Sequence, residues 1–293
     1  MPLTAAQFTS PYFSLYSKAK QLHWDPADID LSADRAQWAM IKREHAGERY
    51  GEQILRLTSL FYEGEESVTR TLAPFCSAVS RAGLGVDKEL FLTTQLYEEA
   101  KHFDFFARYF AEVFEEDGAV TKQFITPAPQ AVLIADLWEV TERLRREDDR
   151  ERLIGVFAES LTHYMGVVEA MLARTGYVGA HDALAARGWL PGLQEGFRLI
   201  KRDEGRHVTF GMRCIAELTD ERPELRDVVA ATFERHLPNV LATVAEFDYP
   251  QPLVDIDKLS AYALAQYQRF AGAAGLGGEV LDEAEYEEED DRQ

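Results

Sequence analysis

The strongest constraint on this chain is a pair of short motifs of the form Glu-x-x-His. The first spans residues 99–102 (EAKH) and the second spans residues 204–207 (EGRH), and both lie in segments whose pattern predicts a helix. Residues three apart share one face of a helix, so each motif directs one carboxylate and one imidazole to the same side. Helices that bring these two faces together would gather four metal-ligating side chains in one place.

Each motif is preceded by a further glutamate at nearly the same distance. Glu65 lies 34 residues before Glu99, and Glu169 lies 35 residues before Glu204. In ferritin-like bundles, a glutamate from each of two helices and a Glu-x-x-His motif from each of two others surround a dinuclear metal site. A single Glu-x-x-His motif is weak evidence, but the repeated arrangement predicts two metal ions between four helices.

The alternative is that these side chains lie on solvated helix surfaces. Their neighbours are mostly apolar, however: residues 90–92 (LFL) precede Glu99, residues 103–106 (FDFF) follow it, and the surroundings of Glu169 and Glu204 are similar. Buried carboxylates need charge partners, and no nearby set of Lys and Arg side chains is obviously sufficient. Metal cations are the more economical explanation.

Composition excludes several other classes of function. The net charge of −20 disfavours direct binding to nucleic acid, and no run of about eighteen apolar residues predicts a transmembrane segment. Cys76 and Cys214 stand far apart in apolar segments, so we interpret them as free thiols in a reducing compartment. The first residues lack the basic and apolar regions of a signal peptide. We expect a cytoplasmic protein that forms a homodimer.

Helical patterns fill the chain and predict an all-α fold, a ferritin-like helix bundle with additional helices. No sustained alternation of period two predicts a strand. Pro74 and the glycine after Ala82 should break and then end a long helical pattern. The expected helices cover roughly residues 45–82, 87–116, 130–146, 150–175, 179–187, 192–219, 223–246 and 255–273.

The last residues differ in composition from the rest. Residues 282–292 (DEAEYEEEDDR) carry eight acids and one arginine, which is typical of a disordered acidic tail. We therefore expect one metal-binding domain over residues 1–280 and a disordered tail over residues 281–293. Docking to a partner is the alternative role for this tail.

Several longer motifs together resemble one known family, the ligand-binding oxidases that are similar to the small subunit of ribonucleotide reductase. These motifs are residues 24–30 (WDPADID), 64–69 (GEESVT), 91–94 (FLTT), 98–102 (EEAKH) and 203–211 (DEGRHVTFG). The resemblance covers roughly residues 11–245. It implies a ferritin-like fold that holds manganese and iron together, with an Fe/Fe pair as the alternative and molecular oxygen as the oxidant. It also implies a long-chain fatty acid or related lipid whose carboxylate binds the metals.

The resemblance further implies an ether cross-link between a valine and a tyrosine beside the metals. The matching valine is Val68, three residues after Glu65, and the matching tyrosine is Tyr164, five residues before Glu169. If Glu66 were the first ligand, a threonine would stand at the valine position, so Glu65 fits the family pattern. Without the resemblance, Val68 and Tyr164 would be interpreted as ordinary core residues.

The spacing of Tyr164 and Glu169 conflicts with a regular helix. Five residues of an α-helix turn about 500°, which leaves the two side chains about 140° apart around the axis. A π-type bulge would bring them onto one face, and such bulges favour functional sites. The sequence alone does not reveal a bulge.

The implied metal ligands divide into two sets. We expect Glu65 and His102 on the first metal, Glu169 and His207 on the second, and Glu99 and Glu204 as bridging or terminal ligands. Carboxylate and imidazole ligands suit manganese and iron.

Asp203 is expected to act behind the metal ligands. In the family it accepts a hydrogen bond from His102 and thereby fixes the tautomer of that imidazole. The alternative is a solvated helix aspartate. Apolar side chains near the motifs could line a channel for the lipid, or could be plain core: Phe103, Phe106, Val168, Met171 and Leu172.

Three functions remain in competition. The first is an oxidase that reduces oxygen and oxidises an organic group by two electrons, with an unknown physiological substrate. The second is a radical-storing ribonucleotide reductase small subunit, in which a tyrosine usually lies four residues after the first motif's histidine. Phe106 holds that position here and has no hydroxyl to oxidise. The third is a non-catalytic ferritin-like protein that binds metal or lipid.

Overall fold

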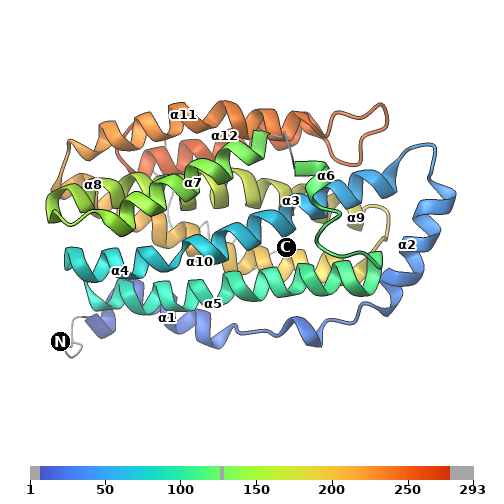
Figure 1. Cartoon of the computed structure of the whole chain (residues 1–293), viewed down its shortest axis with the longest axis horizontal. Helices are drawn as coiled ribbons and strands as arrows, with labels where there is room; N and C mark the ends of the chain where they lie inside the picture. The colour runs from blue at the N-terminus through green and yellow to red at the C-terminus, as the bar shows by residue number, and fades with distance from the viewer. Residues whose placement is uncertain (1–6, 126–128, 278–293) are drawn as a thin grey trace.

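A computed structural model of the chain describes residues 7–125 and 129–277 (Figure 1). Every regular element within these ranges is a helix, which confirms the predicted all-α, ferritin-like bundle with additional helices. The predicted boundary at residue 280 and the acidic tail over residues 281–293 lie outside the described residues. Among the described helices, none combines the length and the hydrophobicity that crossing a bilayer requires.

The helices are continuous over long stretches and include two π-helical segments, η3 and η4. In chain order they are η1 (Gln7–Thr9), α1 (Pro11–Gln21), η2 (Pro26–Asp28), α2 (Ser32–Glu44), α3 (Tyr50–Thr71), α4 (Ala73–Ala82), α5 (Val86–Tyr109), η3 (Phe110–Phe114), α6 (Lys122–Ile125), α7 (Pro129–Arg146), α8 (Arg150–Leu161), η4 (Thr162–Ala173), α9 (Arg174–Ala185), α10 (Pro191–Glu221), α11 (Leu225–Ala245) and α12 (Ile256–Ala273).

Most of these helices run along the long axis of the molecule, and α2 stands across one end (Figure 1). Helix α3 packs on α5, and α10 packs on η4 and α5. These elements carry the Glu-x-x-His motifs and the two additional glutamates. Helices α11 and α12 pack on each other and on η4, so they cover the bundle on the side of Glu169.

The helix boundaries follow from local chemistry. Helix α3 ends before Leu72, and α4 restarts with a proline in its first turn, Pro74, where no backbone N–H is needed. Gly83 then ends α4 in the left-handed conformation, with φ of 67°, as a residue without Cβ readily does. These boundaries match the predicted break and stop.

One expected boundary is wrong. The sequence predicted a helix over residues 150–175 and a separate short helix over 179–187. In the structure α8, η4 and α9 follow one another without interruption from Arg150 to Ala185. The middle part, η4, is π-helical, which the sequence alone did not reveal, and it spans both Tyr164 and Glu169.

The hydrophobic core has two parts. One contains Phe75, Phe157 and Tyr164, and it fills the end of the bundle around α4 and α8. The other contains Phe61 and Phe197, and it fills the end covered by α2. Apolar packing on both sides therefore holds the polar residues between them out of water.

Candidate metal centre

Six inward-facing residues meet between four helical segments. Helix α3 supplies Glu65, α5 supplies Glu99 and His102, η4 supplies Glu169, and α10 supplies Glu204 and His207. All six are buried, with at most 5% of the residue exposed. In each motif the glutamate and the histidine share a helix face because they are three residues apart.

The six side chains form two overlapping groups. Glu65, Glu99, His102 and Glu204 offer ligand atoms within 4.8 Å of one another, and Glu99, Glu169, Glu204 and His207 do the same. Glu99 and Glu204 belong to both groups. The arrangement therefore has one histidine and one unshared glutamate on each side and two carboxylates between them.

Each of the two histidines contacts a carboxylate through its Nε2 atom. The Nε2 atom of His102 lies 3.2 Å from Oδ2 of Asp203, and the Nε2 atom of His207 lies 2.9 Å from Oε2 of Glu98. Since a carboxylate can only accept, each Nε2 carries a proton, so Nδ1 is the nitrogen that can bind a metal once it has no proton. The Nδ1 atoms of both rings are buried and make no hydrogen bond, so they are suited to bind a metal.

The cluster also leaves carboxylate oxygens without partners. Oε2 of Glu65, Glu169 and Glu204 is buried and accepts no hydrogen bond. Burying polar atoms in this way is costly. Five donor atoms without hydrogen bonds, two imidazole nitrogens and three carboxylate oxygens, thus surround one small region. Hard oxygen and imidazole donors of this kind fit manganese or iron.

Burial and mutual repulsion shift the acidity of the cluster. Burial raises the pKa of Glu65, to about 8, and the pKa of Glu169 well above its usual range. Burial alone would lower the pKa values of His102 and His207, but the neighbouring carboxylates outweigh it and raise both. The site therefore attracts positive charge, which protons or metal cations can supply.

Asp203 lies behind His102 and also binds three further side chains. Its Oδ2 accepts hydrogen bonds from Nε1 of Trp24 and from Nζ of Lys101, each at 2.7 Å. Its Oδ1 accepts one from Arg206 at 2.6 Å. Burial alone would raise the pKa of the Asp203 carboxyl, but His102, Arg206 and Lys101 outweigh it and hold that pKa well below its usual range.

Glu98 is a functional residue that the sequence reasoning missed. Its carboxylate contacts Nε2 of His207, as the carboxylate of Asp203 contacts Nε2 of His102. Arg206 donates hydrogen bonds to both acids, at 2.5 Å to Glu98 and at 2.6 Å to Asp203. A signal was present in the sequence. Each Glu-x-x-His motif is directly preceded by another acid, Glu98 in the first and Asp203 in the second.

The π-helical segment η4 places Tyr164 at the cluster. The backbone N–H of Arg174 donates to the carbonyl of Glu169, five residues earlier, which is the π-helical pattern. This pattern brings residues five apart onto one face. The hydroxyl of Tyr164 donates to Oε1 of Glu99 at 2.8 Å. Val68 is buried in the same part of the core as Tyr164.

Two more residues near the cluster were not predicted. The hydroxyl of Tyr177 donates to Oε1 of Glu65, and the ring of Tyr177 stacks on Phe61 with a centroid distance of 4.2 Å. Gln95 donates from Nε2 to Oε1 of Glu169 at 2.9 Å. Both contacts cross between helices, so periodicity along one helix could not reveal them.

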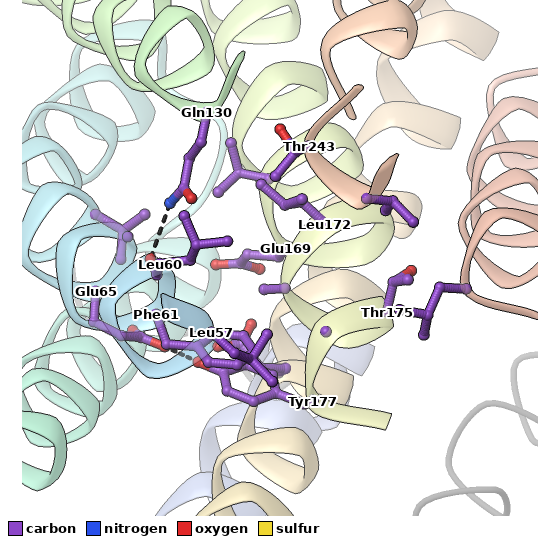
Figure 2. A pocket seen from close by; sticks show the side chains of 18 of the residues that line it. Leu57, Leu60, Phe61, Glu65, Gln130, Glu169, Leu172, Thr175, Tyr177 and Thr243 are labelled. Carbon is purple, nitrogen blue, oxygen red and sulfur yellow. Dashed lines mark hydrogen bonds between the residues drawn. The ribbon is translucent and has the colours of Figure 1, made fainter. Parts of the chain in front are cut away.

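A cavity opens directly beside the cluster (Figure 2). It contains about 760 Å³ of empty space, part of which is open to solvent. Its lining includes Glu65, Glu99, Glu169 and Glu204 and is otherwise mostly apolar, with contributions from α3, η4, α9 and the end of α11.

The lining of this cavity corrects part of the expected channel. Val168 and Leu172 line it as expected, and Val68 lines it too. Met171 is instead fully buried in the core. It follows Glu169 by two residues, so it points away from the face of η4 that carries Glu169.

The two phenylalanines expected in the channel also lie elsewhere. The ring of Phe103 packs on Tyr62 at a centroid distance of 5.1 Å. Phe106 stacks on Phe61 at 5.7 Å and belongs to the core at the α2 end. Neither is among the side chains that line the cavity. Phe103 directly follows His102, so a helix turns it about 100° away from the cluster.

Fold and site together define the class: a ferritin-like bundle with a dinuclear carboxylate–histidine centre. The family model described as "Ribonucleotide reductase, small chain" matches residues 10–271. The chain belongs to this family.

Solved structures to which the chain is similar include R2-like ligand-binding oxidases. A tyrosine-to-phenylalanine variant with an aerobically reconstituted Mn/Fe cofactor is 28% identical, with a TM-score of 0.79, and the match covers 91% of this chain and 94% of that chain. A valine-to-leucine variant with an anaerobically reconstituted Mn/Fe cofactor has the same identity and coverage and a TM-score of 0.80. A glycine-to-leucine variant with a non-activated Mn/Mn cofactor, after aerobic reconstitution with Mn and Fe, is 28% identical over 91% of this chain and 93% of that chain, with a TM-score of 0.80. The family and these relatives indicate an oxidoreductase with a dinuclear metal site.

Proposed function

We propose that this protein is an oxygen-activating oxidase with a manganese/iron pair. Glu65 and His102 would hold one metal, Glu169 and His207 the other, and Glu99 and Glu204 both. The observation that carries the proposal is the pair of overlapping ligand groups that share these two glutamates. An Fe/Fe pair is the alternative loading, because the same donors suit both metals.

The protein's own groups prepare the site for this chemistry. When bound, the metal pair supplies the electrons that reduce molecular oxygen and the oxidising power for a two-electron oxidation. Asp203 and Glu98 orient the imidazoles through Nε2. The two parts of the hydrophobic core keep bulk water away from the four carboxylates.

We infer that the ligand of the cavity is a long-chain fatty acid or a similar lipid. The cavity touches four carboxylates at the candidate metal centre and is mostly apolar elsewhere. A carboxylate head group would compensate the positive charge of the metals in a medium of low dielectric constant. The apolar lining would take up the hydrocarbon chain.

We further propose the ether cross-link between Val68 and Tyr164. The Cβ–H bond of Val68 and the O–H bond of Tyr164 would break, a bond between Cβ and the phenolic oxygen would form, and two protons and two electrons would pass to molecular oxygen. Burial raises the pKa of Tyr164, so the phenol keeps its proton. Oε1 of Glu99 already accepts the hydrogen bond from this hydroxyl and is placed to take up its proton.

The solved relatives support this assignment of positions. They include variants at a glycine, at a valine four positions later and at a tyrosine. Gly64 and Val68 have the same spacing here, and both line the cavity.

Phe106 favours the oxidase over a radical-storing reductase subunit. It occupies the position four residues after His102 and is fully buried against other phenylalanines. Tyr109, nearby on α5, donates to Asp34 at 2.9 Å instead of facing the cluster.

We also propose that the protein is cytoplasmic and forms a homodimer. Cys76 and Cys214 are free thiols, which supports a cytoplasmic location. Size-exclusion chromatography with light scattering tests the expected homodimer.

Metal analysis tests the proposed function. Protein purified after aerobic expression, or reconstituted with both metals in air, should contain about two metal ions per chain, with manganese and iron together. Zinc at a comparable level, or no bound metal after reconstitution, would contradict the proposal.

A further inference from the structure

Some polar side chains that line the cavity have hydrogen-bond partners, and others have polar atoms without one. Tyr177 donates to Glu65, and the hydroxyl of Thr243 donates to the carbonyl of Asn239 at 2.8 Å. Gln130 lines the same cavity, and its Oε1 is buried and has no hydrogen-bond partner among the described residues. Gln130 as a whole is only 4% exposed, so bulk water does not serve this oxygen.

The orientation of the Gln130 amide is fixed by its other end. Nε2 of Gln130 donates to the carbonyl of Leu60 at 2.9 Å, as Figure 2 shows. A backbone carbonyl can only accept, so the nitrogen must face Leu60 and the oxygen must be the free atom. A buried carbonyl oxygen without a donor is unfavourable. This acceptor is therefore left for a hydrogen-bond donor on a molecule in the cavity that Gln130 lines.

The amide of Gln130 lies beside the part of α3 that carries Glu65. A Cβ built on Gly64 would be 3.7 Å from Nε2 of Gln130. Gly64 directly precedes Glu65 and lies one helical turn before Val68. A chain bound with its carboxylate at the metals would pass this amide.

We propose that Gln130 selects a long-chain carboxylic acid that carries a hydroxyl group. The hydroxyl would donate to Oε1 of Gln130, while the carboxylate binds at the metals. The inference rests on the proposed function and adds the chemical class of the ligand. An unsubstituted acid would leave the amide oxygen without a donor, and a site built for a hydroxyl discriminates against a ligand that lacks it.

The test compares binding of two kinds of probe to the metal-loaded full chain. The probes are hexadecanoic acid and a series of hydroxyhexadecanoic acids that differ in the position of the hydroxyl, measured by calorimetry. At least one hydroxy acid should bind about tenfold more tightly than the unsubstituted acid, as expected for one added hydrogen bond. In Gln130→Leu and in Gln130→Met this ratio should fall to about one, with metal content and helicity unchanged.

Thr243→Val is the matched control. Thr243 lines the same cavity, but its hydroxyl is already bonded to Asn239. This variant should leave the ratio between the two kinds of acid unchanged.

Three results would overturn the proposal. Equal affinity for all the acids in the wild-type protein, as when a water molecule serves Gln130, removes the hydroxyl preference but leaves the proposed function intact. If the preference survives in both Gln130 variants and disappears in Thr175→Val, the hydroxyl of the ligand binds Thr175 instead. Oγ1 of Thr175 also lacks a partner among the described residues. Failure of every acid to bind overturns the fatty-acid ligand itself, and the inference with it.

Discussion

Single residues next to the six metal-ligating side chains determine which of their atoms face one another. Asp203 and Glu98 each hold the Nε2 of one histidine, so both Nδ1 atoms turn toward the glutamates. Gln95 and Tyr177 in turn bind one oxygen of Glu169 and of Glu65. The donor atoms are thus positioned before any metal binds, which favours a defined geometry.

Removing one inward-facing residue should release metal but preserve the fold. We expect Glu99→Ala or His207→Ala to lower the metal content from about two ions per chain to fewer than about one, because Glu99 is common to both ligand groups and His207 is the one histidine of its group. The helical circular dichroism should persist, because apolar packing maintains the bundle and the remaining carboxyl groups can take up protons. Elemental analysis and circular dichroism check both parts.

Glu66→Ala is the control for these variants. Glu66 lies next to Glu65 in sequence but forms an exposed ion pair with Arg70, so its loss should leave the metal content unchanged. Full metal occupancy in Glu99→Ala and in His207→Ala would show that the site is wrongly located.

The choice of Glu65 over Glu66 needed the family pattern. Helical spacing was enough to select the other five inward-facing residues, because each constraint lies within one helix or one repeat. It could not identify Tyr177 or Gln95, whose contacts cross from one helix to another. It also placed Phe103 and Phe106 in the channel, because proximity in sequence to His102 does not specify which helix face a side chain occupies.

At the scale of elements, α10 depends on a cap from another helix. Asp34 of α2 is fully buried and accepts hydrogen bonds from the backbone N–H groups of Gly192 and Leu193, each at 2.8 Å. These groups lie in the first turn of α10 and have no partner within the helix. Because α10 carries Glu204 and His207, this cap also fixes the start of a helix that builds the site.

Loss of this cap should destabilise the protein measurably. We expect Asp34→Ala to lower the free energy of unfolding by about 2–3 kcal/mol, because it removes the cap and leaves buried N–H groups unsatisfied. Asp34→Asn keeps one acceptor oxygen and should lose less. Guanidinium unfolding gives both values.

Asp30→Ala provides the comparison. Its carboxylate caps only an exposed turn at Ser32, so the change should stay within about 1 kcal/mol. An Asp34→Ala variant as stable as Asp30→Ala would contradict the role given to Asp34.

Element boundaries set by proline and glycine were predictable, and the π-helical segment was not. Pro74 and Gly83 act through their own backbone chemistry, so the sequence reveals them. In η4, the choice between hydrogen bonds to the fourth and to the fifth preceding residue depends on packing against α10, α11 and α12. For the same reason, the sequence could not show that α8, η4 and α9 are continuous.

For the whole molecule, a buried histidine pair links stability to pH. His163 and His236 stack with their ring centroids 3.9 Å apart. Burial, together with the charge of His236, lowers the pKa of His163 to about 3, against about 6.5 in an unfolded chain. Between these values the unfolded protein binds the proton and the folded protein does not, so the free energy of unfolding falls as the pH is lowered from 6.5 toward 3.

Replacing His163 should reduce this pH dependence. The slope of the free energy of unfolding against pH should be smaller in His163→Gln by up to about 1.4 kcal/mol per pH unit, the value for one proton. Unfolding of metal-free protein between pH 4.5 and 7 measures the slope. His23→Gln, at an exposed position, should keep the wild-type slope, and an unchanged slope in His163→Gln would rule out a buried neutral imidazole.

The cross-link is the most direct test of the whole account, because it requires the metals, oxygen and the geometry of η4 together. Peptide mass spectrometry of metal-loaded, air-exposed protein should find the peptides of Val68 and Tyr164 joined and lighter by two hydrogen atoms. Metal-free protein prepared without oxygen should give two separate peptides, and Tyr164→Phe should abolish the link while both metals stay bound. Only separate peptides from fully metallated, oxygen-exposed wild-type protein would contradict the claim that this centre is an oxidase.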